Sequence, residues 1–190
     1  MDTAVLIDGS NIYATAKALG MSIDYKKLSE YLHTKFNVFR IYYFTAVRPD
    51  NDDNPVIKLA DWLEYNGHKT IIKDTKEFFD PVTGRTKIKG NMDMEMAVAA
   101  YNLIGHVKHI VLFTGDGDFT CLVEDLQRKG IYITVVSTIE IKPPMIADDL
   151  RRMADKFIDL STLTDVLKPF RERSVFEEQR PAPRFGSKPT

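Results

Sequence analysis

Short apolar runs alternate along the chain with stretches in which apolar residues recur every three or four positions. Runs rich in apolar, β-branched and aromatic residues predict buried strands, and spaced apolar residues predict helices that bury one face. The predicted strands are 3–7, 38–47, 68–73, 109–113, 131–136 and 156–160, and the predicted helices are 25–36, 55–66, 91–105, 117–129 and 145–154. Because strands separated by helices need crossover connections, this order predicts an α/β fold with a mostly parallel sheet that helices cover on both faces.

Two stretches interrupt this alternation. Residues 74–90 contain turn formers, among them Pro81 and Gly84, followed by the basic sequence GRTKIKG, and they predict a small hairpin. From about Pro169 onward, charged residues and prolines predominate up to the final RPAPRFGSKPT. Such a composition is typical of disordered segments, so we expect one domain over 1–165 and a disordered, charged tail over 166–190.

Composition and charge narrow the classes of function. The 190 residues carry a formal net charge of -1, so a nucleic-acid partner has to meet a local basic patch rather than a generally basic protein. Cys121 is the only cysteine, which excludes an internal disulfide. We see neither a signal-peptide pattern nor an apolar run long enough to cross a bilayer, and we expect a cytoplasmic protein without membrane contact.

Two predicted strands that lie far apart in the sequence both end on acidic residues. The first runs into Asp8 within LIDGSN, and the fourth runs into Asp116 and Asp118 within TGDGDF. In an open parallel sheet, ligands bind at the carboxyl ends of the strands, near the point where the strand order reverses. Each acid alone is better explained as a turn or helix-cap residue. Three carboxylates at one sheet edge repel each other, however, so together they favour a site that holds a divalent cation.

A third segment, KGNMDMEMAVAAYNLI, adds a further acid. Asp93 has the spacing of the apolar residues Ala97, Ala100 and Ile104, which places its carboxylate on the buried stripe of the predicted helix. The alternative is that Asp93 only complements the helix dipole, a role that Glu95, on a different side of the helix, fits better. Because all candidate ligands are oxygen donors, they favour Mg²⁺ or Mn²⁺ over zinc.

Such an acidic site fits the hydrolysis of phosphodiesters, because a bound cation activates water and neutralises charge on the phosphate. Ser10 and Asn11 follow Asp8 and can orient water or phosphate through hydrogen bonds. Arg85, Lys87 and Lys89 precede the segment of Asp93 and can hold a polyanionic backbone, although a solvated hairpin is the better explanation for any one lysine alone.

Competing motifs are absent from the sequence. It contains no G-x-G-x-x-G after the first strand, no G-x-x-x-x-G-K-[ST] loop and no G-x-S-x-G nucleophile elbow. The histidines lack the spacing of a zinc site, and we expect His106 and His109 to be ordinary surface residues.

At these residues the sequence resembles the NYN domain family, a branch of the PIN-like nucleases, and in particular its LabA-like bacterial members. The matching stretches are VLIDGSNIY (5–13), KGNMDMEMAV (89–98), VLFTGDGDFTCLVEDLQRKG (111–130) and VVSTIEIKPPMIADDLRRMADKFIDL (135–160). Each short motif is common, whereas their combination in this order is specific. The resemblance covers about residues 1–165 and leaves out the tail.

The resemblance implies a three-layer α/β/α sandwich and a metal-dependent ribonuclease site at the sheet edge. It implies that Asp8 is the first metal ligand and that Asn11 supports it. It also implies that Asp93 is the acid of the helix and that Asp116 and Asp118 complete the cluster. We therefore expect an endoribonuclease that depends on Mg²⁺ or Mn²⁺ and acts on RNA, with the existence of a homodimer left open.

Two alternatives stay open at this point. Ala99 stands where we expect many relatives to carry a further acid, six positions after Asp93, and LabA-like members are associated with regulatory roles. The alternative is therefore a catalytically weak or inactive regulatory or RNA-binding module with the same fold. A phosphatase for small phosphoesters uses similar metal chemistry, but it needs a separate aspartate nucleophile, and the sequence does not single one out.

Overall fold

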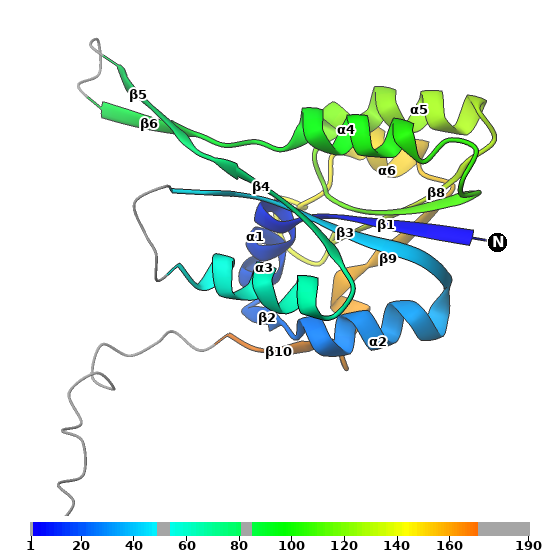
Figure 1. Cartoon of the computed structure of the whole chain (residues 1–190), viewed down its shortest axis with the longest axis horizontal. Helices are drawn as coiled ribbons and strands as arrows, with labels where there is room; N and C mark the ends of the chain where they lie inside the picture. Colours follow the sequence, from blue (N-terminus) through cyan, green and yellow to red (C-terminus); the bar gives the residue numbers. More distant parts are fainter. Residues whose placement is uncertain (1, 49–53, 81–84, 171–190) are drawn as a thin grey trace, which may run out of the picture.

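The computed structural model describes residues 2–48, 54–80 and 85–170 of the chain. Its centre is a sheet of six strands in the order β4-β3-β1-β7-β8-β9, in which all neighbouring strands run parallel (Figure 1). The strands are β1 (Asp2–Asp8), β3 (Asn37–Val47), β4 (Lys69–Asp74), β7 (His109–Phe113), β8 (Tyr132–Ser137) and β9 (Lys156–Asp159). They correspond to the six runs from which strands were predicted.

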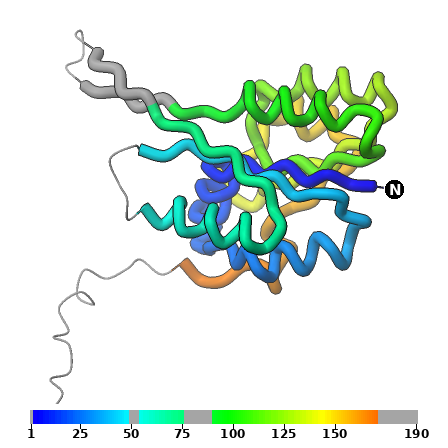
Figure 2. Tube along the Cα trace, in the orientation of Figure 1, coloured from blue at the N-terminus to red at the C-terminus, as the bar shows by residue number. Residues whose placement is uncertain are grey.

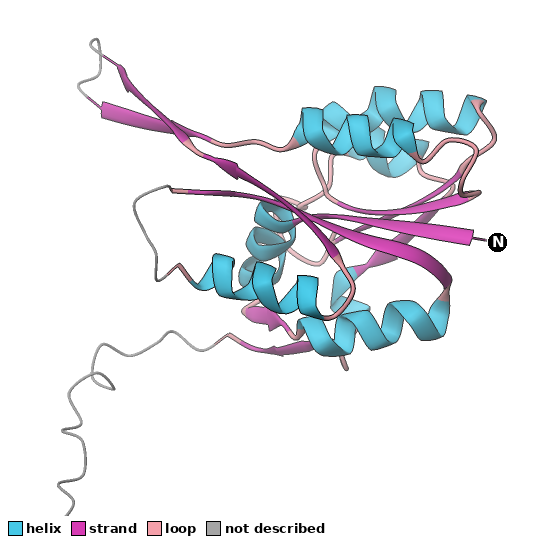
Figure 3. Ribbon diagram, viewed as in Figure 1, coloured by secondary structure: helices cyan, strands magenta, loops and turns pink. Residues whose placement is uncertain are grey.

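Helices cover both faces of this sheet (Figure 3). One face carries α1 (Gly9–Ala18), α2 (Tyr25–Lys35) and α3 (Pro55–Tyr65), and the other carries α4 (Asp93–Asn102), α5 (Thr120–Arg128) and α6 (Asp148–Met153). Alternate residues of β1 enter the two cores: Ala4 and Leu6 pack under α4–α6, and Val5 and Ile7 pack under α1–α3. The predicted three-layer α/β/α fold is therefore confirmed. Within the described ranges, no helix combines the length and the apolarity needed to cross a bilayer.

The strand order reverses between β1 and β7. From β1 the sheet grows through β3 to β4, and the chain then returns to the other side of β1 for β7, β8 and β9. The register pairs Ile7 of β1 with Phe113 of β7. The residues that follow, Asp8 and Thr114, therefore leave the sheet side by side at the point where ligands bind in folds of this kind.

Side-chain caps fix the starts of the predicted helices α2 and α3. Asp24 Oδ1 accepts a hydrogen bond from the backbone N–H of Lys27 at 3.2 Å, and Asn54 Oδ1 accepts one from that of Val56 at 3.0 Å. Pro55 occupies the first turn of α3, where the missing N–H costs nothing. Both helix starts were predicted from these residues.

The prediction of a helix over 145–154 is wrong at its beginning, because α6 starts only at Asp148. The N–H groups of Met145 and Ala147 donate to the carbonyl oxygens of Thr138, at 3.0 Å, and Gly115, at 2.9 Å. These bonds hold the segment against two other loops, and Ala147 has an extended backbone. The segment therefore packs on the loop after β7 instead of forming a first helical turn.

The sequence did not predict α1, β2 (Met21–Ile23), β10 (Leu167–Pro169) or the helical turn η2 (Leu160–Thr162). α1 begins directly after β1, and β2 pairs in antiparallel fashion with β10. Residues 167–169, which the sequence placed in the tail, are thus part of the fold (Figure 2). The tail that we expect over the last residues lies, from residue 171 on, outside the described residues.

The predicted hairpin is present in the backbone as β5 (Lys76–Asp80) and β6 (Arg85–Lys89), and its turn over 81–84 lies outside the described residues. Its base is fixed to the end of β3, because the N–H of Thr75 donates to the carbonyl oxygen of Val47 at 2.8 Å. A Cβ on Gly90 would lie 2.7 Å from the side chains of both Ala46 and Thr75. The chain therefore returns from the hairpin to α4 through a tightly packed glycine.

His109 is not the surface residue that we expected. It is 5% exposed, and its ring nitrogens lie 3.1 Å from Thr3 Oγ1 and 2.9 Å from Thr134 Oγ1. Burial lowers the pKa of His109, and the nearby Lys156 lowers it further. His109 is therefore a core residue at the edge of the sheet opposite to the acids, while His106 is exposed as expected.

Candidate metal centre

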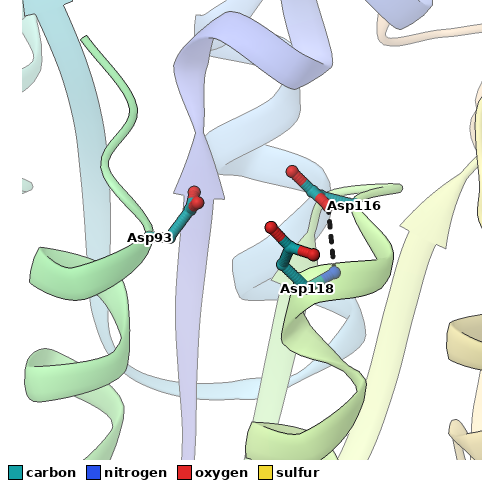
Figure 4. Close-up of side chains that lie close together, drawn as sticks. All are labelled: Asp93, Asp116 and Asp118. Atoms are coloured by element: carbon teal, nitrogen blue, oxygen red, sulfur yellow. Dashed lines mark hydrogen bonds between the residues drawn. The ribbon is translucent and has the colours of Figure 1, made fainter. Parts of the chain in front are cut away.

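Asp93, Asp116 and Asp118 lie together at the carboxyl edge of the sheet, although they come from two distant segments (Figure 4). One carboxylate oxygen of each lies within 4.8 Å of those of the other two, and all three residues are accessible to solvent. Asp93 is the first residue of α4, and Asp118 lies in η1 (Gly117–Phe119), the helical turn that follows Asp116. The structure thus brings together three of the four acids that the sequence proposed as ligands.

The loop after β7 fixes the directions of its two carboxylates. Asp116 caps η1, because its Oδ1 accepts a hydrogen bond from the N–H of Asp118 at 3.0 Å. The N–H of Asp116 in turn donates to Oγ1 of the buried Thr114 at 3.2 Å. Asp116 therefore keeps one oxygen for the cap, and its other oxygen has no partner among the hydrogen bonds of the described residues.

Asn11 connects this loop to the first strand. Its Oδ1 accepts a hydrogen bond from the N–H of Gly115 at 3.0 Å, across the point where the strand order reverses. A Cβ on Gly115 would lie 1.7 Å from the carbonyl oxygen of Met145, so only glycine fits here. Asn11 therefore positions the loop of Asp116, and the packing role of Gly115 escaped the sequence reasoning because it depends on a remote loop.

Asp8 has a local role in the structure. Its Oδ1 accepts hydrogen bonds from Ser10 Oγ at 2.8 Å and from the N–H of Asn11 at 3.0 Å, which makes Asp8 the N-cap of α1. Asp8 is 7% exposed and is not part of the group in which Asp93 and its two partners meet. Its charge still acts on Asp93.

The acids raise the cost of ionising Asp93. Burial raises the pKa of Asp93, and the charges of Asp116, Asp8 and Asp118, followed by Glu95, raise it further. Asn91 Nδ2 donates to Asp93 Oδ2 at 2.7 Å. Burial and the neighbouring negative charges therefore destabilise the ionised form of Asp93 relative to its protonated form.

Glu95 faces away from this cluster, as predicted. Its Oε1 lies 2.7 Å from Lys73 Nζ, and this hydrogen bond lowers the pKa of Glu95. Glu95 is thereby neutralised by a lysine of β4. Among the residues whose side chains the structure describes, which leaves out 76–89, no lysine or arginine forms an ion pair with Asp93, Asp116 or Asp118.

This donor set fits a hard divalent cation. The cluster offers oxygen ligands only and is open to solvent, and no ion pair among the described side chains neutralises its three carboxylates. Mg²⁺ is bound in proteins by a few carboxylates together with waters, so an open, acidic edge of this kind suits it. Asp93, Asp116 and Asp118 are the residues that could hold such an ion.

Of the residues proposed to bind substrate, the structure describes the side chain of Ser10 but not those of the three basic residues. Ser10 is exposed at the start of α1 and donates to Asp8. Arg85, Lys87 and Lys89 lie in β6, which leads into α4, while their side chains lie outside the described part of the structure. Their contact with a polyanion therefore stays a prediction.

The fold and these residues define a doubly wound, parallel α/β protein with a cluster of acids where its strand order reverses. The NYN domain model matches residues 2–162, and the chain belongs to the NYN domain family, a branch of the PIN-like nucleases. The chain is 32% identical to the "Low amplitude and bright protein LabA" of Synechococcus elongatus over 98% of its own length and 93% of that protein. It also resembles the crystal structure of a protein of unknown function from Vibrio parahaemolyticus, with a TM-score of 0.71 and 22% identity over 88% of this chain and 96% of the other.

Proposed function

We propose that this protein is an endoribonuclease that depends on Mg²⁺ or Mn²⁺ and hydrolyses phosphodiester bonds of RNA. One observation carries the proposal: Asp93, Asp116 and Asp118 converge within 4.8 Å where the strand order reverses, in a chain of a nuclease-type family. Asp93 and its two partners would hold the cation. When bound, such a cation supplies an activated water and neutralises charge on the phosphate.

The other residues of the site support this chemistry through position. Asn11 holds the loop of Asp116 through Gly115. Ser10 is exposed next to Asp8, and its hydroxyl oxygen, whose proton is donated to Asp8, can accept a hydrogen bond from an ordered water. The second oxygen of Asp8 has no hydrogen bond among the described residues and remains available for the cation or its waters. We assign to Arg85, Lys87 and Lys89 the contact with the RNA backbone, whose charge favours lysine and arginine.

The position of Ala99 does not weaken the cluster. Ala99 lies four residues after Glu95 and shares its side of α4, and both line a shallow hollow next to Ile71. An acid at position 99 would therefore lie beside Glu95 rather than beside Asp93. Its absence removes no ligand from the three acids that meet.

The test is the cleavage of single-stranded RNA, both linear and circular, by the full chain with Mn²⁺. We expect cleavage of both substrates, which is stopped by EDTA and reduced at least about a hundredfold by Asp116→Asn. The matched control is Asp165→Asn, which removes an exposed carboxylate outside the acidic cluster and should leave the rate unchanged. Cleavage that persists both in EDTA and in Asp116→Asn would overturn the proposed mechanism.

A non-catalytic, RNA-binding regulatory module is the second candidate. It is favoured by the engagement of Asp8 as a helix cap, which leaves three rather than four acids in the cluster. It is also compatible with the name of the LabA relative, which mentions no nuclease activity. RNA that is bound with Mn²⁺ present but never cleaved would support this candidate over the enzyme.

A further inference from the structure

An aromatic hollow of about 350 Å³ opens at the start of α1, on the side of the sheet that carries α1 and α3. We call it the tyrosine hollow; its walls include Ser10, Tyr13, Tyr25, Tyr43, Val56 and Leu59. Ser10 belongs both to this wall and to the cap of α1, where its hydroxyl donates to Asp8. The hollow therefore adjoins Asp8 through Ser10, and the charge of Asp8 acts in turn on Asp93 of the acidic cluster.

The floor of the hollow is built from two tyrosines in fixed positions. The rings of Tyr25 and Tyr43 lie 5.6 Å apart at an angle of 89°, so the edge of one meets the face of the other. A Cβ on Gly9 would lie 2.5 Å from the hydroxyl oxygen of Tyr43, so glycine at this position admits the tyrosine. The aromatic floor thus depends on the same turn that follows Asp8.

Tyr13 stands at the rim and is 54% exposed. Phe170 contacts it edge-on at 6.5 Å between ring centroids, and Lys17 Nζ lies 6.0 Å from its ring centroid. These neighbours hold an exposed aromatic ring in place without covering it. A large exposed ring beside an apolar hollow offers a stacking surface.

We propose that the tyrosine hollow binds one nucleobase of the RNA strand whose phosphate lies at the acidic cluster. Among the described residues that line the hollow there is no charged side chain, so the group that it accepts is uncharged. Its volume lies at the lower end of the range for small-molecule sites, which suits one planar ring system rather than a peptide helix. The inference rests on the proposed function, and it adds that the enzyme selects a single-stranded substrate, because a paired and stacked base cannot enter.

The recognition is expected to tolerate different bases. Every base has a face that can stack on an aromatic ring, and stacking of one base on a protein aromatic changes affinity roughly tenfold. The lining of the hollow is predominantly aromatic and aliphatic, which favours stacking over a specific pattern of hydrogen bonds. We therefore expect adenosine and uridine to bind, and ribose alone not to bind.

The first experiment separates this inference from catalysis. Adenosine, uridine and ribose are titrated into the full chain in EDTA, and amide chemical shifts are recorded by NMR. Both nucleosides should change the amide chemical shifts of Gly9, Ser10 and Tyr13, and ribose should not. Val56→Trp, which fills the hollow, should abolish these changes. Equal shifts with ribose, or with an apolar additive that carries no ring, would overturn the inference.

The second experiment uses RNA with a single abasic site that is moved along the strand. With the abasic site at one position of the strand, RNA should bind roughly tenfold more weakly than intact RNA. This roughly tenfold difference between the two RNAs should vanish in Tyr13→Ala and persist in Tyr13→Phe. The control is Tyr65→Ala, which removes a tyrosine that is 92% exposed at the far end of α3. An abasic penalty that is absent at every position overturns the inference. Nucleoside binding without any cleavage in Mn²⁺ overturns only the proposed function.

Discussion

Removing the charge of Asp118 should have opposite consequences with and without a divalent cation. Asp118 is exposed, and its carboxylate accepts no hydrogen bond within the described part of the chain, so Asp118→Asn changes little besides the charge. At a separation of 4.8 Å, two unit charges repel by about 0.9 kcal/mol in a medium with the dielectric constant of water. Asp118 takes part in two such pairs, and salt at about 0.1 M reduces their sum to about 1 kcal/mol.

Asp118→Asn removes this repulsion but also removes a favourable charge at the start of α5, where the helix dipole stabilises a negative charge by about 0.3–1 kcal/mol. We therefore expect Asp118→Asn to be about 0.5 kcal/mol more stable than the unaltered chain in EDTA, which is a rise in Tm of about 1–2 °C. Mn²⁺ at one hundred times its Kd should stabilise the unaltered chain by about 2.7 kcal/mol. A hundredfold loss of affinity in the variant should leave only about 0.4 kcal/mol of this stabilisation.

The assay is thermal unfolding of the unaltered chain, Asp118→Asn and the control Asp165→Asn, each in EDTA and in Mn²⁺. The unaltered chain and the control should gain about 5–11 °C with Mn²⁺, and Asp118→Asn about 1–2 °C. A full Mn²⁺-induced gain in Asp118→Asn would refute the assignment of this carboxylate as a ligand. A clear loss of stability in EDTA would refute the repulsion on which the magnitude rests.

Three further predictions concern the surroundings of the site. Asn11→Ala should lower the free energy of unfolding, measured by urea titration, by about 1–3 kcal/mol, because it leaves the buried N–H of Gly115 unpaired. The same change should reduce cleavage, because it displaces the loop that carries Asp116. Glu95→Gln should leave cleavage unchanged, because Glu95 pairs with Lys73 rather than with the cation; a large loss of activity would contradict the geometry. Burial raises the pKa of Asp159, but hydrogen bonds to its carboxylate outweigh burial and lower the pKa overall. The stabilisation by ionised Asp159 is therefore present above the pKa of the unfolded chain and is lost as the pH falls through the pKa of the folded chain. The loss of Tm caused by Asp159→Asn should accordingly become smaller in acid.

The sequence was informative wherever local pattern decides structure. The apolar run of β1 and the capping residues Asp24 and Asn54 are each explained by neighbouring residues, and they were predicted. The approach of Asp93 to Asp116 was predicted from two features. Asp116 follows a central parallel strand, whose carboxyl end lies at the ligand-binding edge, and Asp93 shares the spacing of the buried stripe of its helix.

What the sequence missed depends on contacts between distant segments. β10 forms only because Leu167 and its neighbours pair with β2, and nothing local marks them as a strand. His109 is buried between Thr3 and Thr134, which lie on the two adjacent strands. The direction of the Asp8 carboxylate likewise depends on α1, which starts without any intervening loop and whose polar first turn resembles an ordinary turn in the sequence.

The central claim is that a divalent cation binds among Asp93, Asp116 and Asp118. The most direct measurement is an anomalous difference map from a crystal of the full chain soaked in Mn²⁺. We predict one strong peak with a carboxylate oxygen from each of the three residues at about 2.0–2.5 Å. A map without a peak at this edge of the sheet, or with a peak that contacts only one of the three carboxylates, would contradict the account.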